Sequence, residues 1–418
     1  MLFRILNFPN LLMLTVLLCG CFKDSRVAGK RTDIMDQLNS SGSFEPIQTP
    51  AMETRSSWGG PVKRNVVSPN FYIDDGIRES WSLQTNSGRF LGSPIIYEKK
   101  IITLDQNGKI QCLNLITKKV LWVYSILKLT DSDKIILGGG LSHDSAGNLL
   151  VTTSLGEILS ISINDGSLNW RYKIDSPVMD SPVIIDNNIF IIDSKNSIRS
   201  LSLSGTLNWL TKGIPHDEIR SRTGTAVPAE NLVIVPSSSG FLLALDMITG
   251  DQQWDFKFKF LRAGYSQNSF GSFDGKPKVY DDVIYFGSLN GQFNALKLNG
   301  EKLWQSPVGL QGSPLLISNS LFFISDRNNL VRLDRRNGSL IWKKKLGEEN
   351  ELQSFFSPIL IGSRIWVARS SGKLSSFDVS TGELIEEFTS SFGIAGPPIY
   401  YSGGIILYTN SGKLVGFE

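Results

Sequence analysis

Residues Gly240–Trp254, GFLLALDMITGDQQW, contain the unit that the rest of the chain repeats. Leu242–Leu245 read as a short apolar strand. Asp246–Gly250 has the composition of a tight turn, with an Asp that can bond its own backbone and a Gly that tolerates positive φ. Trp254 lies at the start of the next strand, and the alternating stretch Asp255–Phe260 continues it. One strand pair cannot bury its apolar side alone, so a chain that repeats the pair is expected to stack the copies.

A Trp four residues after a turn Gly marks most of the copies. These pairs are Gly166 and Trp170, Gly205 and Trp209, Gly250 and Trp254, Gly300 and Trp304, and Gly338 and Trp342. Trp122 fits with Lys118 at the Gly position, and Trp81 lies one interval upstream. The turn at Gly382 fits with Glu386 at the Trp position. Copies of roughly 40 to 50 residues, with about four strands and one Trp each, are typical of a β-propeller, in which we expect the Trp residues to pack between blades rather than to hold a cofactor.

Two further markers recur with the same interval. Residues that readily adopt the left-handed conformation stand at Gly108, Gly156, Asn196, Gly240, Gly291, Asn328, Gly372 and Gly412. A Pro opens a strand in most copies, at Pro94, Pro182, Pro228, Pro277, Pro314, Pro358 and Pro398, whereas the second copy has Gly138–Gly140 nearby. The markers predict an all-β fold, an eight-bladed β-propeller of four-stranded blades.

The two ends of the repeated region predict how the ring closes. The last copy stops at Glu418, shortly after the sequence Gly412–Phe417, and lacks its turn and its Trp strand. The sequence Trp81–Gln84, upstream of the first full copy, is a strand of the missing type. We expect these two segments to pair, which removes exposed sheet edges and makes residues 80–418 one propeller domain.

The N-terminus resembles a bacterial lipoprotein signal. Ile5–Leu18 is mostly apolar but short and interrupted, and Leu18, Gly20 and Cys21 stand in the order that such signals have before a lipidated Cys. The resemblance implies a signal peptide over residues 1–20 and lipidation of Cys21. Phe22 rather than Asp follows that Cys, and the resemblance to sorted lipoproteins therefore implies an anchor in the outer membrane, facing the periplasm.

Residues 21–79 show no repeat and are predicted to be a flexible tether after the lipidated Cys, because Ser, Gly and Pro are scattered through them. The chain has 42 Lys and Arg and 39 Asp and Glu, a formal net charge of +3, without a long basic run. That charge gives little support to nucleic-acid binding. Pairs such as Arg335 and Arg336 are expected to be solvated turn charges.

The sequence shows no set of residues suited to catalysis. Its two His residues, His143 and His216, are expected in loops and form no metal pair or Ser-His-Asp set. Cys112, the remaining Cys of the mature chain, lies on an apolar strand and is expected to be a small buried residue. Asp246, Asp334 and Asp378 precede turn glycines and are interpreted as turn formers. We therefore expect no catalytic, cofactor-binding or metal-binding residues.

The motif LxALDxxTGxxxW resembles the repeat of propellers related to pyrroloquinoline-quinone enzymes. In that group, the quinoprotein dehydrogenases hold the quinone beside a vicinal Cys-Cys disulfide, which the mature chain lacks. The chain is similar over nearly the whole propeller, including Ile136–Gly140, to the BamB family of outer-membrane assembly lipoproteins. This resemblance implies an eight-bladed propeller with a lipoprotein signal, a tether and no cofactor, as part of the barrel-assembly machinery.

In the BamB family, two neighbouring inter-blade loops contact a periplasmic repeat domain of the central β-barrel subunit. The first carries a Leu-x-Leu-Arg element, and the matching residues here are Ile219, Arg220, Ser221 and Arg222, with Ser221 departing from the second Leu. The second carries Asp-x-Asp, matched by Ser272, Phe273 and Asp274, with Ser272 departing from the first Asp. The segments Ile214–Gly224 and Phe260–Gly275 are also the long excursions of their copies, and long loops on a rigid ring are common binding sites.

Three hypotheses follow. The first is a non-catalytic scaffold, lipid-anchored to the periplasmic face of the outer membrane, that binds the central barrel subunit and assists insertion of outer-membrane proteins, with nascent outer-membrane proteins as further partners that could pair with exposed strand edges. The second is a periplasmic quinoprotein-like enzyme with a ligand in the central channel. The third is a propeller that binds cell-wall glycan or another envelope protein.

Overall fold

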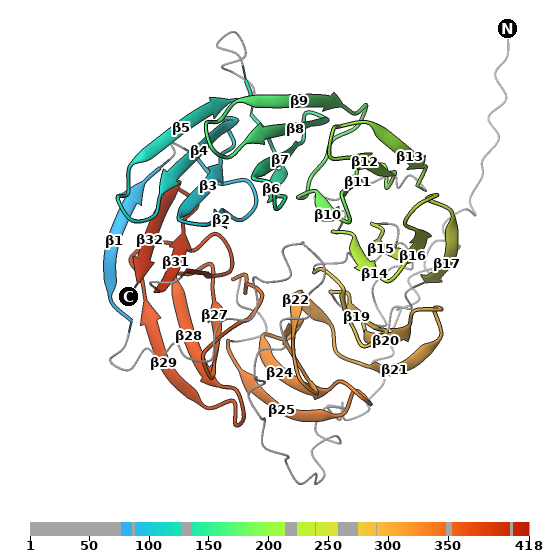
Figure 1. Ribbon diagram of the computed structural model, residues 1–418. Helices are drawn as coiled ribbons and strands as arrows, with labels where there is room; N and C mark the ends of the chain where they lie inside the picture. The colour runs from blue at the N-terminus through green and yellow to red at the C-terminus, as the bar shows by residue number, and fades with distance from the viewer. Residues whose placement is uncertain are drawn as a thin grey trace, which may run out of the picture. The chain divides into compact units, whose positions relative to one another are not determined.

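The computed structural model describes residues 77–85, 88–127, 135–213, 224–238, 240–257, 275–289, 291–347, 353–401 and 404–417. All of these residues belong to the unit Asn39–Glu418 into which the chain's contacts group it. Their regular structure consists of strands, arranged as eight four-stranded antiparallel sheets around a ring (Figure 1). The predicted all-β, eight-bladed propeller is therefore confirmed.

Each sheet is one blade, and its strands follow one another from the axis to the rim. The innermost strands are β2 (Ile95–Tyr97), β6 (Gly139–His143), β10 (Val183–Ile185), β14 (Val227–Ala229), β18 (Lys278–Tyr280), β22 (Leu310–Ile317), β26 (Ile359–Ile361) and β30 (Ile399–Tyr401). The second strands are β3 (Lys100–Leu104), β7 (Asn148–Thr153), β11 (Asn188–Ile192), β15 (Leu232–Pro236), β19 (Val283–Gly287), β23 (Ser320–Ser325), β27 (Arg364–Ala368) and β31 (Gly404–Tyr408).

The outer half of each blade repeats in the same way. The third strands are β4 (Lys109–Asn114), β8 (Glu157–Ser162), β12 (Ile198–Ser202), β16 (Phe241–Asp246), β20 (Phe293–Lys297), β24 (Asn329–Asp334), β28 (Lys373–Asp378) and β32 (Lys413–Phe417). The outermost strands are β5 (Val120–Ser125), β9 (Leu168–Lys173), β13 (Leu207–Thr211), β17 (Gln252–Lys257), β21 (Lys302–Ser306), β25 (Leu340–Lys345), β29 (Leu384–Thr389) and β1 (Glu79–Gln84). We number the blades 1 to 8, from β2–β5 to the blade that ends in β32.

The ring closes through pairing of strands from opposite ends of the chain. Strand β1 is the outermost strand of blade 8 and pairs with β32 in antiparallel register, with Leu83 opposite Leu414 and Ser82 opposite Val415. The blue β1 and the red β32 lie side by side in Figure 1. The predicted closure is confirmed, and it leaves no blade with an incomplete sheet.

Six junctions between neighbouring blades are built from the predicted Trp residues. The indole N–H donates to a carbonyl oxygen in the turn that precedes the outermost strand of the next blade, from Trp122 to Ile163, Trp170 to Leu203, Trp209 to Met247, Trp254 to Leu298, Trp304 to Arg335, and Trp342 to Ser380, at 2.7–3.1 Å. The ring packs on the positive-φ Gly of that turn, where an added Cβ would lie only 2.4–3.0 Å from a ring atom. Each junction therefore requires both the Trp and the Gly.

The third strand and the turn also fit the indole. The residue paired with the Trp is small in blades 1 to 5, being Cys112, Ser160, Ser200, Ala244 and Ala295 in that order. Cys112 is fully buried there, which confirms the expectation of a small buried residue.

In the turns, Asp246 accepts hydrogen bonds from the N–H groups of Ile248 and Thr249 at 2.9 Å, so its predicted role as a turn former is confirmed.

Antiparallel order defines two ends of the ring. One end, which we call the turn face, carries the turns that join the first to the second strand of each blade and the third to the fourth strand of blades 1 to 7. The other, the connection face, carries the turns between second and third strands and the links that run to the next blade. The predicted left-handed residues lie in the latter turns, and seven have positive φ: Gly108, Gly156, Asn196, Gly240, Asn328, Gly372 and Gly412.

The core lies between blades rather than within one. Each cluster of buried apolar residues combines side chains of two adjacent blades, as with Ile102 of blade 1 and Leu149 of blade 2, or Ile234 of blade 4 and Ile284 of blade 5. Near the axis the inner segments meet so closely that a Cβ on Gly140 would lie 2.1 Å from Ser181 Oγ. The ring is therefore a single packed object whose stability depends on every junction.

We predict that Trp254→Ala lowers the free energy of unfolding by about 3–5 kcal/mol, because it removes a large packed side chain and leaves a cavity between blades 4 and 5. Denaturant unfolding would measure the loss. Gln253→Ala, at the exposed neighbouring position, is the control. A loss below about 1 kcal/mol for Trp254→Ala, typical of a surface change, would contradict the junction role.

Candidate partner-binding face

The seven residues that the family resemblance selects lie outside the described part of the chain. Ile219, Arg220, Ser221 and Arg222 fall in the link between β13 and β14, and Ser272, Phe273 and Asp274 fall in the link between β17 and β18. Cys21 and the tether also lie outside the described residues. The structure therefore describes only the residues on either side of these two candidate segments.

Both links join an outermost strand to the innermost strand of the next blade. The first leaves blade 3 after Thr211 and reaches blade 4 at Val227, and the second leaves blade 4 after Lys257 and reaches blade 5 at Lys278. Their described ends consequently lie on the connection face, on the two sides of blade 4. The two segments that the sequence analysis selected thus start and finish on the same face of the propeller.

The end of the first link is held by contacts to neighbouring blades. Gly224 has a φ of 76°, and a Cβ there would lie 2.6 Å from Pro236 Cγ. Thr225 is buried, and its hydroxyl donates to Asp180 Oδ2 at 3.1 Å in the link between blades 2 and 3. The backbone carbonyl of Asp180 also accepts from Thr152 Oγ1 at 2.6 Å. This end of the link is therefore tied to blades 2, 3 and 4.

The end of the second link is held in a similar way by blade 6. A Cβ on Gly275 would lie 1.8 Å from the carbonyl oxygen of Gly312, and the N–H of Lys276 donates to Ser313 Oγ at 2.9 Å. Lys278 follows on β18, where burial, helped by the nearby charge of Lys276, lowers the pKa of its ammonium group to about 8. The described residues with which the two links enter blades 4 and 5 are therefore both fixed to the ring.

An exposed apolar group lies on the same face, at the start of blade 2. Ile135, Leu137 and Leu155 are 54%, 77% and 41% exposed, and the N–H of Leu137 donates to Ser154 Oγ, next to Leu155. Leu155 is the third residue of its four-residue turn, a position that is polar in the seven other blades. The sequence analysis missed this group, although a comparison of that turn position across the copies would have found Leu155.

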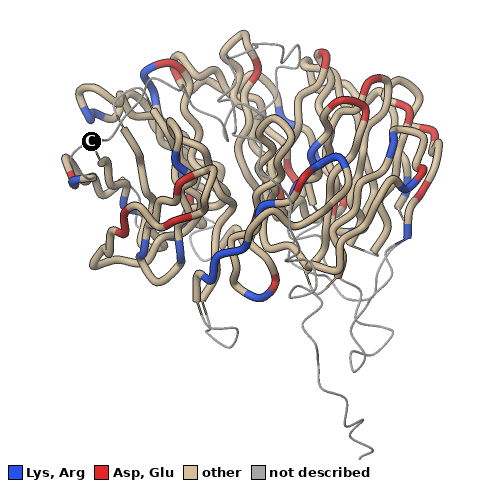
Figure 2. Tube along the Cα trace, turned by 90° about the horizontal axis from the view of Figure 1, so that it is seen from below, with Lys and Arg blue, Asp and Glu red and all other residues tan. Residues whose placement is uncertain are grey.

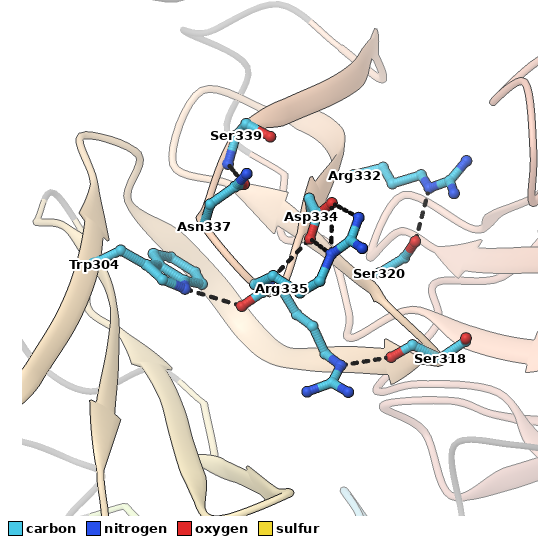
Figure 3. Close-up of polar contacts among 9 residues, drawn as sticks. Trp304, Ser318, Ser320, Arg332, Asp334, Arg335, Asn337 and Ser339 are labelled. Atoms are coloured by element: carbon cyan, nitrogen blue, oxygen red, sulfur yellow. Dashed lines mark hydrogen bonds and ion pairs between the residues drawn. The ribbon is translucent and has the colours of Figure 1, made fainter. Parts of the chain in front are cut away.

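On the turn face, the structure corrects the expectation for Arg335. Its Nε donates to the carbonyl of Ser318 at 2.9 Å (Figure 3). Its guanidinium lies 4.5 Å from the centroid of the Tyr280 ring, and its Nη2 lies 3.5 Å from Asp281 Oδ2. The Arg335 side chain is 13% exposed, whereas that of Arg336, paired with Asp334 of its own turn, is 59% exposed. The prediction of a solvated turn charge is thus wrong for Arg335, which joins blades 5 and 6.

The described residues offer no cluster of three or more His, Cys, Asp or Glu side chains that could hold a metal ion. His143 is the last residue of β6, so its predicted loop position is wrong, and its ring packs edge-on against Tyr97 with a centroid distance of 5.2 Å. His216 lies outside the described residues. Burial raises the pKa of the Cys112 thiol to about 11, which keeps it protonated and unreactive at neutral pH.

Charge and hydropathy add two observations. Acidic and basic residues are interspersed around the propeller in Figure 2, in keeping with the small net charge. Within the described ranges, no helix has the length and apolar character that crossing a membrane would need.

Eight four-stranded blades, seven of them with a Trp on the outermost strand, define a β-propeller of the quinoprotein-like repeat class. The family model described as "Outer membrane protein assembly factor BamB" matches residues 128–344, just over half of the chain. The chain belongs to this family. The family is that of an assembly factor, which agrees with the expectation that the chain is not an enzyme.

Relatives and solved structures agree with this assignment. The outer membrane protein assembly factor BamB of Bordetella pertussis is 23% identical over 348 residues, which cover 81% of this chain and 86% of the relative. The crystal structure of BamB from Moraxella catarrhalis matches with a TM-score of 0.70 at 16% identity, covering 82% of this chain and all of that one. A quinohemoprotein alcohol dehydrogenase from Comamonas testosteroni matches with a TM-score of 0.63 at 12% identity, which shows a shared fold alone.

We predict that Arg335→Ala lowers the free energy of unfolding by about 1–3 kcal/mol, because it leaves the Ser318 carbonyl without its donor and uncovers the Tyr280 ring. Arg336→Ala, the matched control in the same turn, should cost less than about 1 kcal/mol, as expected for an exposed ion pair. Chemical denaturation with unchanged m-values would measure both. Equal losses for the two variants would contradict the role of Arg335 between the blades.

Proposed function

We propose that the chain is a non-catalytic, lipid-anchored scaffold of the barrel-assembly machinery. In this proposal it binds the central β-barrel subunit and assists the insertion of outer-membrane proteins. The observation that carries the proposal is the match of residues 128–344 to the BamB family. The name of that family refers to outer-membrane protein assembly, and the covered share of the relatives extends the likeness over most of their length.

The binding face is proposed to be the connection face around blade 4. Support comes from the family motif, which selects the segments Ile219–Arg222 and Ser272–Asp274, and from the described ends of both links, which lie on that face. The contacts at Thr225 and Lys276 would fix where the two segments join the ring. Arg222 and Asp274 would supply charges of opposite sign to the partner.

The exposed apolar group Ile135, Leu137 and Leu155 would extend the same interface toward blade 2. Exposed apolar side chains that gather on a folded surface often mark a protein-binding site. Three such residues on the connection face would add a hydrophobic contact beside the charged segments. We therefore place the partner across blades 2 to 5 rather than on blade 4 alone.

The membrane anchor is proposed to be lipidated Cys21, joined to the propeller by the tether that ends at β1. As the outermost strand of blade 8, β1 starts on the turn face, opposite the proposed binding face. A tether of more than fifty residues, at roughly 3.3 Å per residue when extended, could span on the order of 180 Å. The propeller could then reach its partner without leaving the periplasmic face of the outer membrane.

A photoreactive residue at Arg222 is predicted to crosslink to the central β-barrel subunit in envelope membranes, because this position belongs to the proposed interface. Ile248, an 83% exposed residue on the turn face of blade 4, is the matched control at the other end of the same blade. Mass spectrometry of the crosslinked products would identify the partner. Equal capture of this subunit from both positions, or none from Arg222, would contradict the proposed interface.

Cys21→Ser is predicted to move the chain from the outer-membrane fraction to the soluble periplasmic fraction, because two or more acyl chains are needed for stable anchoring. Membrane fractionation and the mass of the mature N-terminus would measure this. Cys112→Ser serves as the control for loss of a thiol and should remain membrane-bound. Retention of the Cys21→Ser protein in the outer membrane would show that lipidation is not the anchor.

A further inference from the structure

The two junctions that depart from the Trp rule are the two borders of blade 8. Blade 7 has Glu386 where six other blades have a Trp that contacts the next blade. On the other border, Trp81 donates its indole N–H to the Tyr401 hydroxyl at 3.3 Å, rather than to a turn carbonyl of blade 1. Blade 8 is also the blade whose outermost strand comes from the opposite end of the chain. The two departures therefore coincide with ring closure.

Ring closure removes the structure that a Trp would need. In the regular junctions, the Trp contacts a turn between the third and outermost strands of the next blade. Blade 8 has no such turn, because its third strand β32 and its outermost strand β1 are the last and the first described strands of the chain. Ile77, two residues before β1, lies where this turn would be. Its backbone N–H takes no part in the pairing of β1 with β32.

Glu386 contacts this incoming backbone directly. The N–H of Ile77 donates to Glu386 Oε1 at 2.9 Å, and Arg364 Nη1 lies 3.5 Å from Glu386 Oε2. The Ile77 side chain is buried in the cluster that joins blades 7 and 8, together with Ile359 and Phe417. A carboxylate that accepts a backbone N–H and pairs with a guanidinium forms stronger hydrogen bonds than a neutral acceptor.

The row of blade 7 that contains Glu386 differs from the other rows in a second way. Trp366, Ser376 and Glu386 are paired across three adjacent strands, so their side chains share one side of the sheet. The Trp of this row is thus on the second strand instead of the outermost one. Trp366 Nε1 and Ser376 Oγ have no hydrogen-bond partner among the described residues, whereas Glu386 Oε2 has the ion pair with Arg364. Buried polar groups without a partner are costly, so packing alone does not account for the composition of this row.

At the border between blades 8 and 1, a side chain likewise takes the place of a backbone group in the contact between blades. Lys118 stands at the Gly position of the blade 1 turn with a φ of 59°, and its Nζ lies 3.9 Å from the centroid of the Trp81 ring. The same Nζ donates to the carbonyl of Leu115, which occupies the place of the Trp acceptor in the regular turns. A strand that arrives from the far end of the chain is therefore held on both sides by dedicated polar side chains.

We infer that Glu386 is the positioning residue for ring closure, in which its carboxylate binds the backbone N–H at the end of the tether and places β1 in register on β32. The site takes a segment of the chain itself, the residues that join the tether to β1. The inference concerns the propeller and does not depend on the identity of the partner.

Hydrogen exchange of the full chain, followed by mass spectrometry, tests this inference. Glu386→Ala is expected to speed exchange of the peptide that covers residues 77–84 by about tenfold or more, because it removes a charge-assisted hydrogen bond. The peptide that covers β20 and β21 should not change. Glu386→Gln keeps an acceptor and should stay within about threefold of the parent, since neutral hydrogen bonds also contribute.

Glu386→Trp separates closure from general stability, because it restores the residue that the repeat has elsewhere. We expect it to speed exchange of residues 77–84 at least as much as Glu386→Ala and to expose Arg78 to trypsin. Glu383→Ala, which changes a 71% exposed carboxylate of the same blade, is the control and should leave this peptide unchanged. Unchanged exchange in Glu386→Ala, slower exchange in Glu386→Trp, or equal acceleration of all blades would each overturn the inference.

Discussion

The contact between one indole ring and the turn of the next blade determines how this chain forms a ring. The indole donates to a turn carbonyl, as Trp254 does to Leu298, and its ring packs on a Gly that has no room for a Cβ. A blade cannot bury its outer face by itself, so each Trp is useful only when the next blade is present. The same requirement couples the blades energetically and makes the ring a single cooperative unit, unlike an open array of repeats.

That constraint also explains the irregular blade. The contact needs a turn between third and outermost strands, and a closed ring made from one chain must lack that turn in one blade when the ends meet there. Glu386 and Lys118 are found on the two borders of this blade. Because the ring itself is rigid, the copies are free to differ from one another in the links between blades. The candidate partner-binding residues lie in two of these links. A fold that resembles quinoprotein enzymes can in this way serve as a scaffold without using its axis for chemistry.

The repeat was predictable because its signals are local. A Trp at a fixed spacing after a Gly, and turn residues at a fixed interval, depend only on neighbours in sequence. Both signals predicted eight blades, and the structure confirms that number. Arg335 was predicted wrongly because its partners, Ser318, Tyr280 and Asp281, come from other turns. Glu386 was visible as an exception, but its partner is a backbone N–H, which has no sequence signature. His143 was predicted in a loop, whereas it is the last residue of β6, a strand without the Pro that marks the other inner strands. The partner-binding residues rest on the family motif, since a loop carries no periodic pattern.

Direct binding between the purified full chain and the purified central β-barrel subunit tests the central claim most directly. The comparison is between the parent protein and the double variant Arg222→Glu with Asp274→Lys, whose charges are reversed on the proposed face. The account predicts saturable binding by the parent, at least tenfold weaker binding by the variant (about 1.4 kcal/mol) and the same melting temperature for both. Equal binding by the two proteins, with the fold intact, would contradict the proposed scaffold interface.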